Sequence, residues 1–253
     1  KIFLSYVNEK EKGCYNTAVL MGEMNLKKII FKKIFNPSKC IKKINEYGEF
    51  YYLEAGGALE IFNDDQLLLS TGTFRYRDLA QEEDNVFGKI LLIDFKKNEK
   101  KILSMGHRNV QGIFFDKKTN TIFSTDHGPE GGDEINIIVD PLNNKIKNFG
   151  WPISSYGEHY GGRVEKNIEK YKKAPLHKSH IDYGFIEPLT YFVPSIAPSN
   201  IIFVPQEFNK NNKNQIFVSA MGLKSGPGRR SIHSFFFDQK QKLTSHEIIP
   251  LVD

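Results

Sequence analysis

Short runs of Ile, Phe, Leu, Val and Tyr recur along the chain, and Gly, Asn, Asp and Pro separate them. Runs of this length between turn-forming residues are typical of β-strands, and few windows hold the 3.6-residue period of an amphipathic helix. The pattern therefore predicts an all-β fold, with one short helical or irregular insertion at Leu79–Asn85. Strands are expected at Ile2–Tyr6, Lys28–Lys32, Ala58–Ile61, Gln66–Ser70, Gly88–Asp94, Gly112–Phe115, Thr121–Thr125, Glu134–Ile138, Ile201–Val204, Gln215–Ser219 and Ser231–Phe237.

One pattern repeats along the chain: an apolar strand, a polar turn, and a second apolar strand that ends in a small residue. It runs from Leu59 to Gly72, from Ile113 to Asp126 and, more loosely, from Ile201 to Ala220. Hairpin units that recur about every 50 to 90 residues are typical of a β-propeller with variable loops. A β-sandwich remains the alternative, because hairpins alone also fit that architecture.

The composition fits a globular chain with a sizeable core. The 253 residues are 40% hydrophobic and 13% aromatic, and no Pro/Ser-rich or Gly/Ser-rich stretch marks a linker, so we expect a single domain over residues 1–253. The net charge of +5 comes with lysines spread through turn-like segments, which favours a solvated surface over nucleic-acid binding. No stretch of about 18 apolar residues predicts a membrane-spanning helix.

The two cysteines, Cys14 and Cys40, leave two alternatives open: a disulfide formed in an oxidising compartment, or two free buried thiols. Their spacing matches no metal-binding motif. The chain shows no signal peptide and opens directly on the strand-like segment Lys1–Tyr6, so we expect that residues are missing upstream.

The segment Gly106–Gly112 (GHRNVQG) crowds polar side chains between two glycines just before a predicted strand. Arg108 can grip a carboxylate with two parallel hydrogen bonds, while Asn109 and Gln111 offer both donors and acceptors. Such a cluster suits a planar, polyanionic ligand. The alternative is a turn whose polar groups satisfy their own backbone.

A second segment, residues 124–136 (STDHGPEGGDEIN), follows a predicted strand and is dense in oxygen ligands and flexible glycines. The carbonyls of Gly128 and Pro129, beside several carboxylates, suit a hard cation such as calcium. The alternative is an ordinary loop of solvated carboxylates. His127 fits a metal ligand, a proton carrier or polar packing.

Four motifs together resemble the glucose/sorbosone dehydrogenase family, in particular its soluble aldose sugar dehydrogenases: GHRNVQG, DHGPEGGDEINII, NFGWPISSYGEHYGG and PSIAPSN. The resemblance implies a six-bladed β-propeller that holds pyrroloquinoline quinone (PQQ) and calcium and oxidises aldose sugars to lactones outside the cytoplasm. This chain would supply about four of the six blades and be truncated at both ends. Further chain or an oligomeric partner would then close the ring.

The resemblance also assigns roles to individual residues. It implies that Arg108, Asn109, Gln111 and His127 contact the quinone, and that the carbonyls of Gly128 and Pro129 bind calcium. Lys224 resembles the family's cofactor-binding lysine, with an offset of about two residues in the alignment.

The chain departs from the family where the catalytic base should lie. The family's histidine, arginine and aspartate correspond here to Glu54, Ala58 and Thr73. Glu54 is therefore the candidate substitute base, and the alternative is an ordinary loop carboxylate. Phe74–Asp78 (FRYRD) resembles the family's Arg-x-Arg-Asp strand, but it lies in a different loop and is not counted as its replacement.

Three functions are compatible with this sequence. The first is PQQ- and calcium-dependent oxidation of an aldose, with an unidentified electron acceptor, in the periplasm or outside the cell. The second is a non-catalytic propeller that binds a sugar, a quinone or a protein partner. The third is an interaction module without cofactor or cation.

Overall fold

The computed structural model describes residues 1–253 except 26, 46–47, 209–213, 223–229, 239–241 and 252–253. The chain divides into two compact units, one of residues 1–110 and 144–152 and the other of residues 111–143 and 153–253. The expectation of one domain over residues 1–253 stays a prediction. None of the helices in the described parts of the chain is long and apolar enough to cross a membrane.

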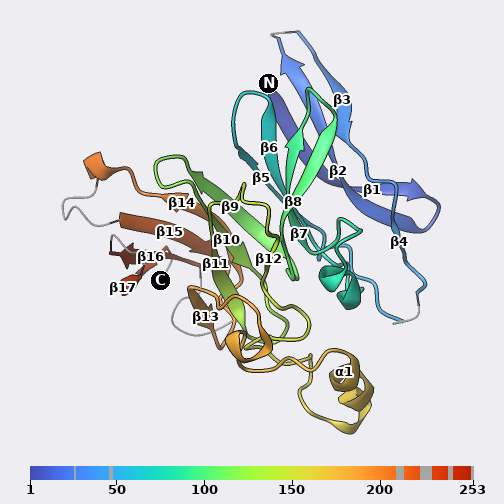
Figure 1. Cartoon of the computed structure of the whole chain (residues 1–253), viewed down its shortest axis with the longest axis vertical. Coiled ribbons are helices and arrows are strands. Elements are labelled where there is room, and N and C mark those ends of the chain that lie inside the picture. Colours follow the sequence, from blue (N-terminus) through green and yellow to red (C-terminus); the bar gives the residue numbers. More distant parts are fainter. Residues whose placement is uncertain (26, 46–47, 209–213, 223–229, 239–241, 252–253) are drawn as a thin grey trace. The chain divides into compact units, whose positions relative to one another are not determined.

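The first unit contains two sheets, coloured blue to green in Figure 1. One has the antiparallel order β1-β2-β3, with a fourth short strand paired to β2: β1 (Ile2–Glu11), β2 (Cys14–Met24), β3 (Ile29–Phe35) and β4 (Ile41–Lys42). The other is an antiparallel meander of four consecutive strands, with a fifth strand running parallel to β8: β5 (Gly56–Ile61), β6 (Gln66–Thr71), β7 (Lys89–Asp94), β8 (Glu99–Met105) and β12 (Lys147–Asn148).

The second unit also contains two four-stranded sheets. The first has the order β13-β11-β10-β9, and its strands are β9 (Val110–Asp116), β10 (Thr121–Asp126), β11 (Asp133–Val139) and β13 (Thr190–Phe192). The second is the antiparallel meander β14 (Pro198–Phe203), β15 (Asn214–Ala220), β16 (Ser231–Phe237) and β17 (Leu243–Pro250). The helical turns are η1 (Arg77–Gln81), η2 (Glu165–Asn167), α1 (Ile168–Lys173), η3 (Ile181–Tyr183) and η4 (Gln206–Phe208).

The all-β prediction is confirmed, and each of the eleven predicted strands overlaps an observed one. Sheets of mostly sequential antiparallel strands, following one another along the chain, are typical of propeller blades. The number of blades in the whole protein stays a prediction. The sequence pattern missed β2, β8 and β17, among others.

Each unit has its own hydrophobic core, built on alternate positions of its strands. In the first unit Leu67 and Leu69 of β6 pack with Leu91 and Ile93 of β7, because a period of two places these side chains on one face. In the second unit the fully buried Ile135 and Phe235 are part of the corresponding cluster. Sheet packing, rather than helical packing, therefore stabilises both units.

The predicted insertion at Leu79–Asn85 begins within η1 and is then irregular. It is held by Lys89, whose buried ammonium donates to the carbonyls of Leu79, Ala80 and Phe87 at 2.8, 3.0 and 2.7 Å. Burial lowers the pKa of Lys89 to about 7, against the opposing effect of nearby carboxylates. The lysine thus adds to the hydrogen bonds that the Leu79 and Ala80 carbonyls also accept from Asn85 and from the Gly106 amide.

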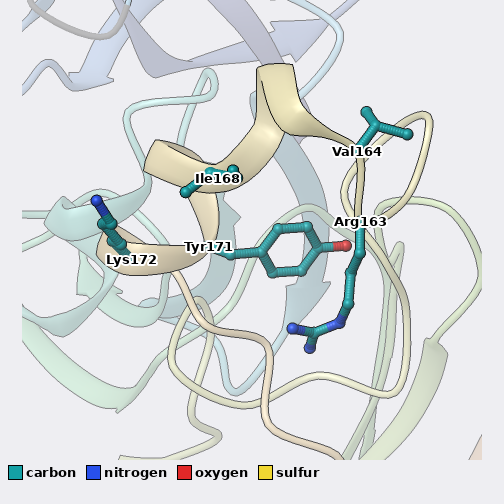
Figure 2. Close-up of a pocket in the computed structure, with 5 residues that line it drawn as sticks. All are labelled: Arg163, Val164, Ile168, Tyr171 and Lys172. Carbon is teal, nitrogen blue, oxygen red and sulfur yellow. The ribbon is translucent and has the colours of Figure 1, made fainter.

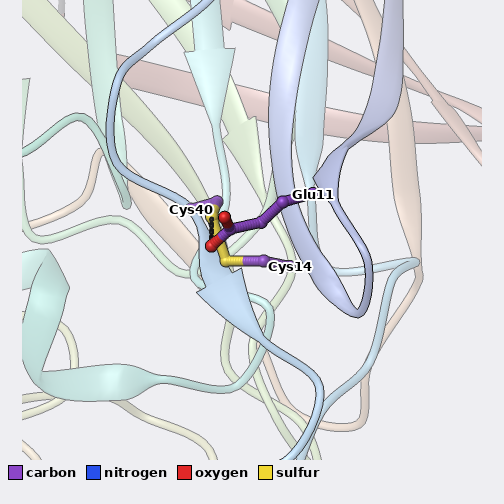
Figure 3. Close-up of side chains that lie close together, drawn as sticks. All are labelled: Glu11, Cys14 and Cys40. Atoms are coloured by element: carbon purple, nitrogen blue, oxygen red, sulfur yellow. Dashed lines mark hydrogen bonds between the residues drawn. A yellow bond between two sulfur atoms is a disulfide. The ribbon is translucent and has the colours of Figure 1, made fainter.

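Cys14 and Cys40 form a disulfide, with their Cα atoms 5.4 Å apart, so the free-thiol alternative was wrong. The carboxylate of Glu11 lies beside the two sulfurs (Figure 3). Because disulfide sulfurs offer no thiolate to a metal, this cluster is a covalent cross-link and not a cation site.

Candidate functional site

Glu54 is buried, with 3% of its surface exposed, and lies in the loop just before β5. Its Oε1 accepts hydrogen bonds from Arg108 Nη2 at 2.6 Å and from Arg75 Nε at 2.9 Å. Its Oε2 accepts no hydrogen bond from any described residue. The carboxylate is therefore anchored through one oxygen, and its role as a base or as a structural loop carboxylate stays a prediction.

Arg75 reaches Glu54 from an unusual backbone conformation. Phe74 and Arg75 follow one another with φ of +51° and +74°, in the left-handed region that non-glycine residues rarely adopt. The Phe74 ring is fully buried and stacks on Phe50, while the Phe74 amide donates to the Glu54 carbonyl at 2.9 Å. This packing holds the turn, and the turn directs Arg75 onto Glu54, where Arg75 also lies over the Tyr51 ring at 4.6 Å.

Arg108 is 5% exposed and lies 5.6 Å from the centre of the Trp151 ring. Two buried polar atoms close to it have no hydrogen-bond partner among the described residues: Trp151 Nε1 and Thr73 Oγ1. Thr73 is tied to the same segment, because its amide donates to the Arg108 carbonyl at 3.2 Å. A buried polar atom without a partner costs free energy, so a ligand with hydrogen-bonding groups or ordered water is expected beside Arg108.

Asn109 links the GHRNVQG segment to the loop that follows Glu54. Its Oδ1 accepts a hydrogen bond of 3.0 Å from the amide of Gly56, two residues after Glu54. Gly56 has φ of +67°, and a Cβ there would lie 2.8 Å from the Gly72 amide, so only glycine lets this loop approach β6 so closely. The first unit thus brings together Glu54, Arg108, Asn109 and Thr73.

The Gly128–Asp133 loop lies in the second unit, between β10 and β11. Asp133 holds it closed, because Oδ1 accepts from the Gly128 amide at 2.9 Å while Oδ2 accepts from the amides of Ile196 and Ala197, both at 2.8 Å. Glu130 accepts from the Gly161 amide at 2.8 Å. The carboxylates of Asp133 and Glu130 thus accept hydrogen bonds from backbone amides. The backbone carbonyls of Gly128 and Pro129 remain the predicted cation ligands.

The other predicted cofactor contacts are distributed as follows. His127 is partly buried and its Nε2 pairs with the carbonyl of Pro198. Gln111, on β9, is the first residue of the second unit and is partly buried. Lys224 lies outside the described residues.

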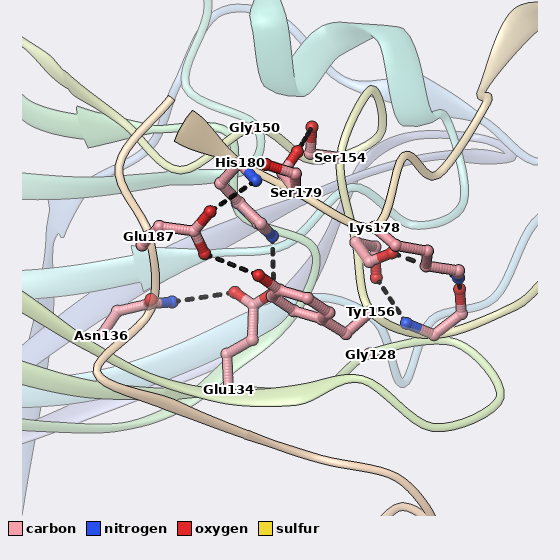
Figure 4. A network of polar contacts seen from close by, with 12 residues as sticks. Gly128, Glu134, Asn136, Gly150, Ser154, Tyr156, Lys178, Ser179, His180 and Glu187 are labelled. Carbon is pink, nitrogen blue, oxygen red and sulfur yellow. Dashed lines mark hydrogen bonds and ion pairs between the residues drawn. The ribbon is translucent and has the colours of Figure 1, made fainter. Parts of the chain in front are cut away.

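Strand β11, which comes directly after this loop, contributes Glu134 and Asn136 to a buried polar network (Figure 4). Glu134 Oε1 lies 3.3 Å from Nε2 of the buried His180, and Glu134 Oε2 accepts from Asn136 at 3.2 Å. Tyr156 stacks on His180 and donates to Glu187 at 2.8 Å. Burial raises the pKa of the Glu134 carboxyl, although His180 and Asn136 oppose the shift.

Comparison with known proteins identifies the family of the chain. The family model described as Glucose / Sorbosone dehydrogenase matches residues 1–250.

The chain belongs to the glucose/sorbosone dehydrogenase family.

Relatives within the family include the aldose sugar dehydrogenase YliI of Escherichia coli, 28% identical over 237 residues, which are 87% of this chain and 58% of YliI. The quinoprotein glucose dehydrogenase B of Acinetobacter calcoaceticus is 38% identical over 61 residues, which are 24% of this chain and 12% of that protein. The chain thus spans less than two thirds of the length of these curated relatives.

Among solved structures, the apo form of the soluble aldose sugar dehydrogenase of Escherichia coli superposes with a TM-score of 0.74 at 25% identity, covering 98% of this chain and 68% of that one. The PQQ-bound aldose sugar dehydrogenase of Streptomyces coelicolor shares the fold, with a TM-score of 0.66 at 17% identity, and covers 98% and 61% of the two chains. The family resemblance and the propeller-type fold inferred from the motifs are thereby confirmed.

Sequence analysis missed three residues of these clusters: Arg75, Trp151 and His180. Arg75 lies in the FRYRD segment, which was noticed only for its likeness to a different strand. Trp151 is the chain's one tryptophan, beside the GHRNVQG motif in space and 43 residues from Arg108 in sequence. A lone buried aromatic residue or histidine gives no sequence signal that separates a site from a core.

Proposed function

We propose that the protein oxidises an aldose sugar to its lactone, using PQQ and a calcium ion. The observation that carries this proposal is the anchoring of Glu54, whose Oε1 is bound by Arg75 and Arg108 while its Oε2 has no donor among the described residues. A general base must be fixed in orientation and must keep a lone pair for the incoming proton. Glu54 meets both conditions at the position of the family's histidine.

The residues of each unit fit the chemistry of the two cofactors. PQQ is a planar tricarboxylate. The Arg108 guanidinium can form two hydrogen bonds with one of its carboxylates, and the neighbouring Trp151 ring offers a flat aromatic surface for it. The buried Trp151 Nε1 and Thr73 Oγ1 are polar atoms for which such a ligand would supply partners. The carbonyls of Gly128 and Pro129 are hard oxygen ligands suited to calcium. Asn109, Gln111, His127 and Lys224 complete the proposed cofactor contacts.

Arg108 and Asn109 would help hold the quinone, which would supply a two-electron acceptor for the hydride of the sugar's anomeric carbon. Glu54 Oε2 takes the proton of the anomeric hydroxyl, so the carbon–oxygen bond becomes the carbonyl of the lactone and the sugar loses two electrons and two protons in total. Arg75 and Arg108 keep the carboxylate in position during proton transfer. Arg108 also offsets the negative charge that the hydride brings.

A non-catalytic homologue that binds a sugar, a quinone or a protein partner is the second candidate, and one observation favours it. Two guanidinium groups already pair with Glu54 Oε1, which gives this carboxylate a structural role that requires no proton transfer. In that case the pocket would retain binding without turnover.

The disulfide between Cys14 and Cys40 supports a periplasmic or secreted location, because disulfides persist in oxidising compartments. The electron acceptor is proposed to be a separate molecule. Further chain or an oligomeric partner is proposed to complete the propeller.

Reconstitution of the purified protein with PQQ and calcium separates the two candidates. Quinone binding is followed by absorbance titration, and turnover by reduction of a dye with several aldoses. Saturable binding with sugar-dependent dye reduction supports the dehydrogenase, and binding without turnover supports the homologue. Absence of PQQ binding by the demonstrably folded protein contradicts the dehydrogenase and also a homologue that binds a quinone.

A further inference from the structure

A surface pocket in the second unit is formed by the segment that contains η2 and α1 (Figure 2). Its volume is about 320 Å³, within the range of small-molecule sites. It is lined by Arg163, Val164, Ile168, Tyr171 and Lys172. The last three are spaced by three and four residues on α1, so they share one face of that turn.

The pocket has an apolar side and a cationic side. Val164 and Ile168 are 43% and 50% exposed, so their aliphatic surface is available to a ligand in this pocket. Arg163 lies with its guanidinium 4.4 Å from the centre of the Tyr171 ring, and Lys172, whose ammonium pairs with Glu169 at 2.7 Å, also lines the pocket. Apolar surface and positive charge are thus presented together.

The Tyr171 side chain is fixed in position by hydrogen bonds of its hydroxyl and by packing of its ring. Its hydroxyl donates to Glu158 and accepts from the His159 amide, and the His159 ring packs against it edge to face at 4.5 Å. Glu158 is engaged by Lys178 at 3.0 Å, whereas the Arg163 Nε lies 4.0 Å from its carboxylate. The Arg163–Glu158 contact is therefore a loose one, and an incoming anion can compete for this guanidinium.

We propose that this pocket binds a small organic anion, with its carboxylate on Arg163 and its apolar body against Val164, Ile168 and the Tyr171 ring. The charge of the surrounding segment agrees with this class of ligand. Residues 163–178 carry six lysines and arginines against two glutamates. The proposal does not depend on the dehydrogenase activity.

The test uses 2-naphthoate as the probe and isothermal titration of the whole protein. Saturable binding is expected, weakened about tenfold or more in Arg163→Gln, because glutamine cannot form the charge-assisted hydrogen bond with the carboxylate. Lys166→Gln removes one positive charge from the same exposed segment without touching the pocket and is expected to bind as the native protein does. The neutral 2-naphthylmethanol tests the need for the carboxylate.

Three results would overturn the proposal. They are the absence of saturable 2-naphthoate binding, equal binding by Arg163→Gln and the native protein, and equal affinity for the neutral alcohol. Because Arg163 is exposed, the Arg163→Gln variant should have the same midpoint of thermal unfolding as the native protein. A thermal melt of each variant checks this. Since none of these measurements involves PQQ or sugar turnover, a negative result here leaves the dehydrogenase proposal intact.

Discussion

Glu54 and Arg108 form a buried ion pair, in which Arg108 Nη2 donates to Glu54 Oε1 at 2.6 Å. Sequence analysis assigned the two residues different roles, one as base and the other as a cofactor ligand. Because the two side chains are in direct contact, the position of the Glu54 carboxylate depends on Arg108, the residue proposed to hold the quinone. A change at either residue is therefore expected to affect both binding and proton transfer.

Arg75 is expected to act as a positioning residue for Glu54. Arg75→Asn removes the guanidinium while keeping a residue type that tolerates φ of +74°. We expect kcat for sugar-dependent dye reduction to fall about tenfold, the range for a lost charge-assisted hydrogen bond, with the PQQ affinity little changed. Titration and steady-state kinetics measure the two quantities.

Arg163→Gln, which removes an exposed guanidinium in the other unit, is the control for the Arg75 experiment. Native kcat in Arg75→Asn would show that Arg108 alone positions the carboxylate. An equal fall in kcat in Arg75→Asn and Arg163→Gln would indicate a general effect of lost positive charge and would contradict a positioning role for Arg75.

Glu134 is expected to make the stability depend on pH. Because burial raises its folded-state pKa above the ordinary value of 4.5, the folded state binds the proton more tightly than the unfolded state. This contribution to stability is fully present below pH 4.5 and is lost as pH rises through the folded-state pKa. Urea unfolding of Glu134→Gln at several pH values should show a smaller decline with rising pH than the native protein. An unchanged pH dependence would contradict this account of Glu134.

His233 predicts a pH effect of the opposite sign. Its Nδ1 lies 2.9 Å from His246 Nε2, and burial, with a smaller effect of His246, lowers the pKa of His233 to about 4. The unfolded state, with an ordinary value of 6.5, therefore takes up the proton first, and stability is lost as pH falls from about 6.5 towards 4. His233→Gln should lose less stability over this interval, as measured by urea unfolding, than a His177→Gln control. The same dependence of unfolding free energy on pH in the two variants would contradict this account of His233.

The disulfide closes a loop between residues 26 apart in sequence. Replacing both cysteines, Cys14→Ser with Cys40→Ser, should lower the free energy of unfolding by roughly 3 kcal/mol, since the unfolded chain regains the entropy of the open loop. Urea unfolding measures the loss, and the native protein under reducing conditions should lose a similar amount. Unchanged stability in both cases would mean that the cross-link adds nothing to the fold.

The sequence predicted those strands whose apolar residues form compact runs between turn formers, such as Gln66–Thr71 and Ser231–Phe237. It missed β2 because buried Asn16 and Thr17 interrupt its apolar pattern, and β8 because it opens on the exposed residues Glu99–Lys101. The helix α1 was missed because six residues are too few to display a helical period.

For the candidate site, motifs identified Arg108 and Asn109 because they lie together in one unusual segment. Arg75 was not found, since its role depends on a left-handed turn and on a partner 21 residues away. The anchoring of a single carboxylate oxygen is likewise a property of three-dimensional geometry.

The most direct test of the central proposal is the turnover of Glu54→Gln reconstituted with PQQ and calcium. Glutamine keeps the shape of the side chain but cannot accept the hydroxyl proton, so dye reduction should fall by about 10²- to 10⁴-fold while PQQ binding stays measurable. Glu49→Gln, which changes another arginine-paired carboxylate in the same unit, is the matched control and should retain most activity. Near-native turnover by Glu54→Gln would contradict the role of Glu54 as the base.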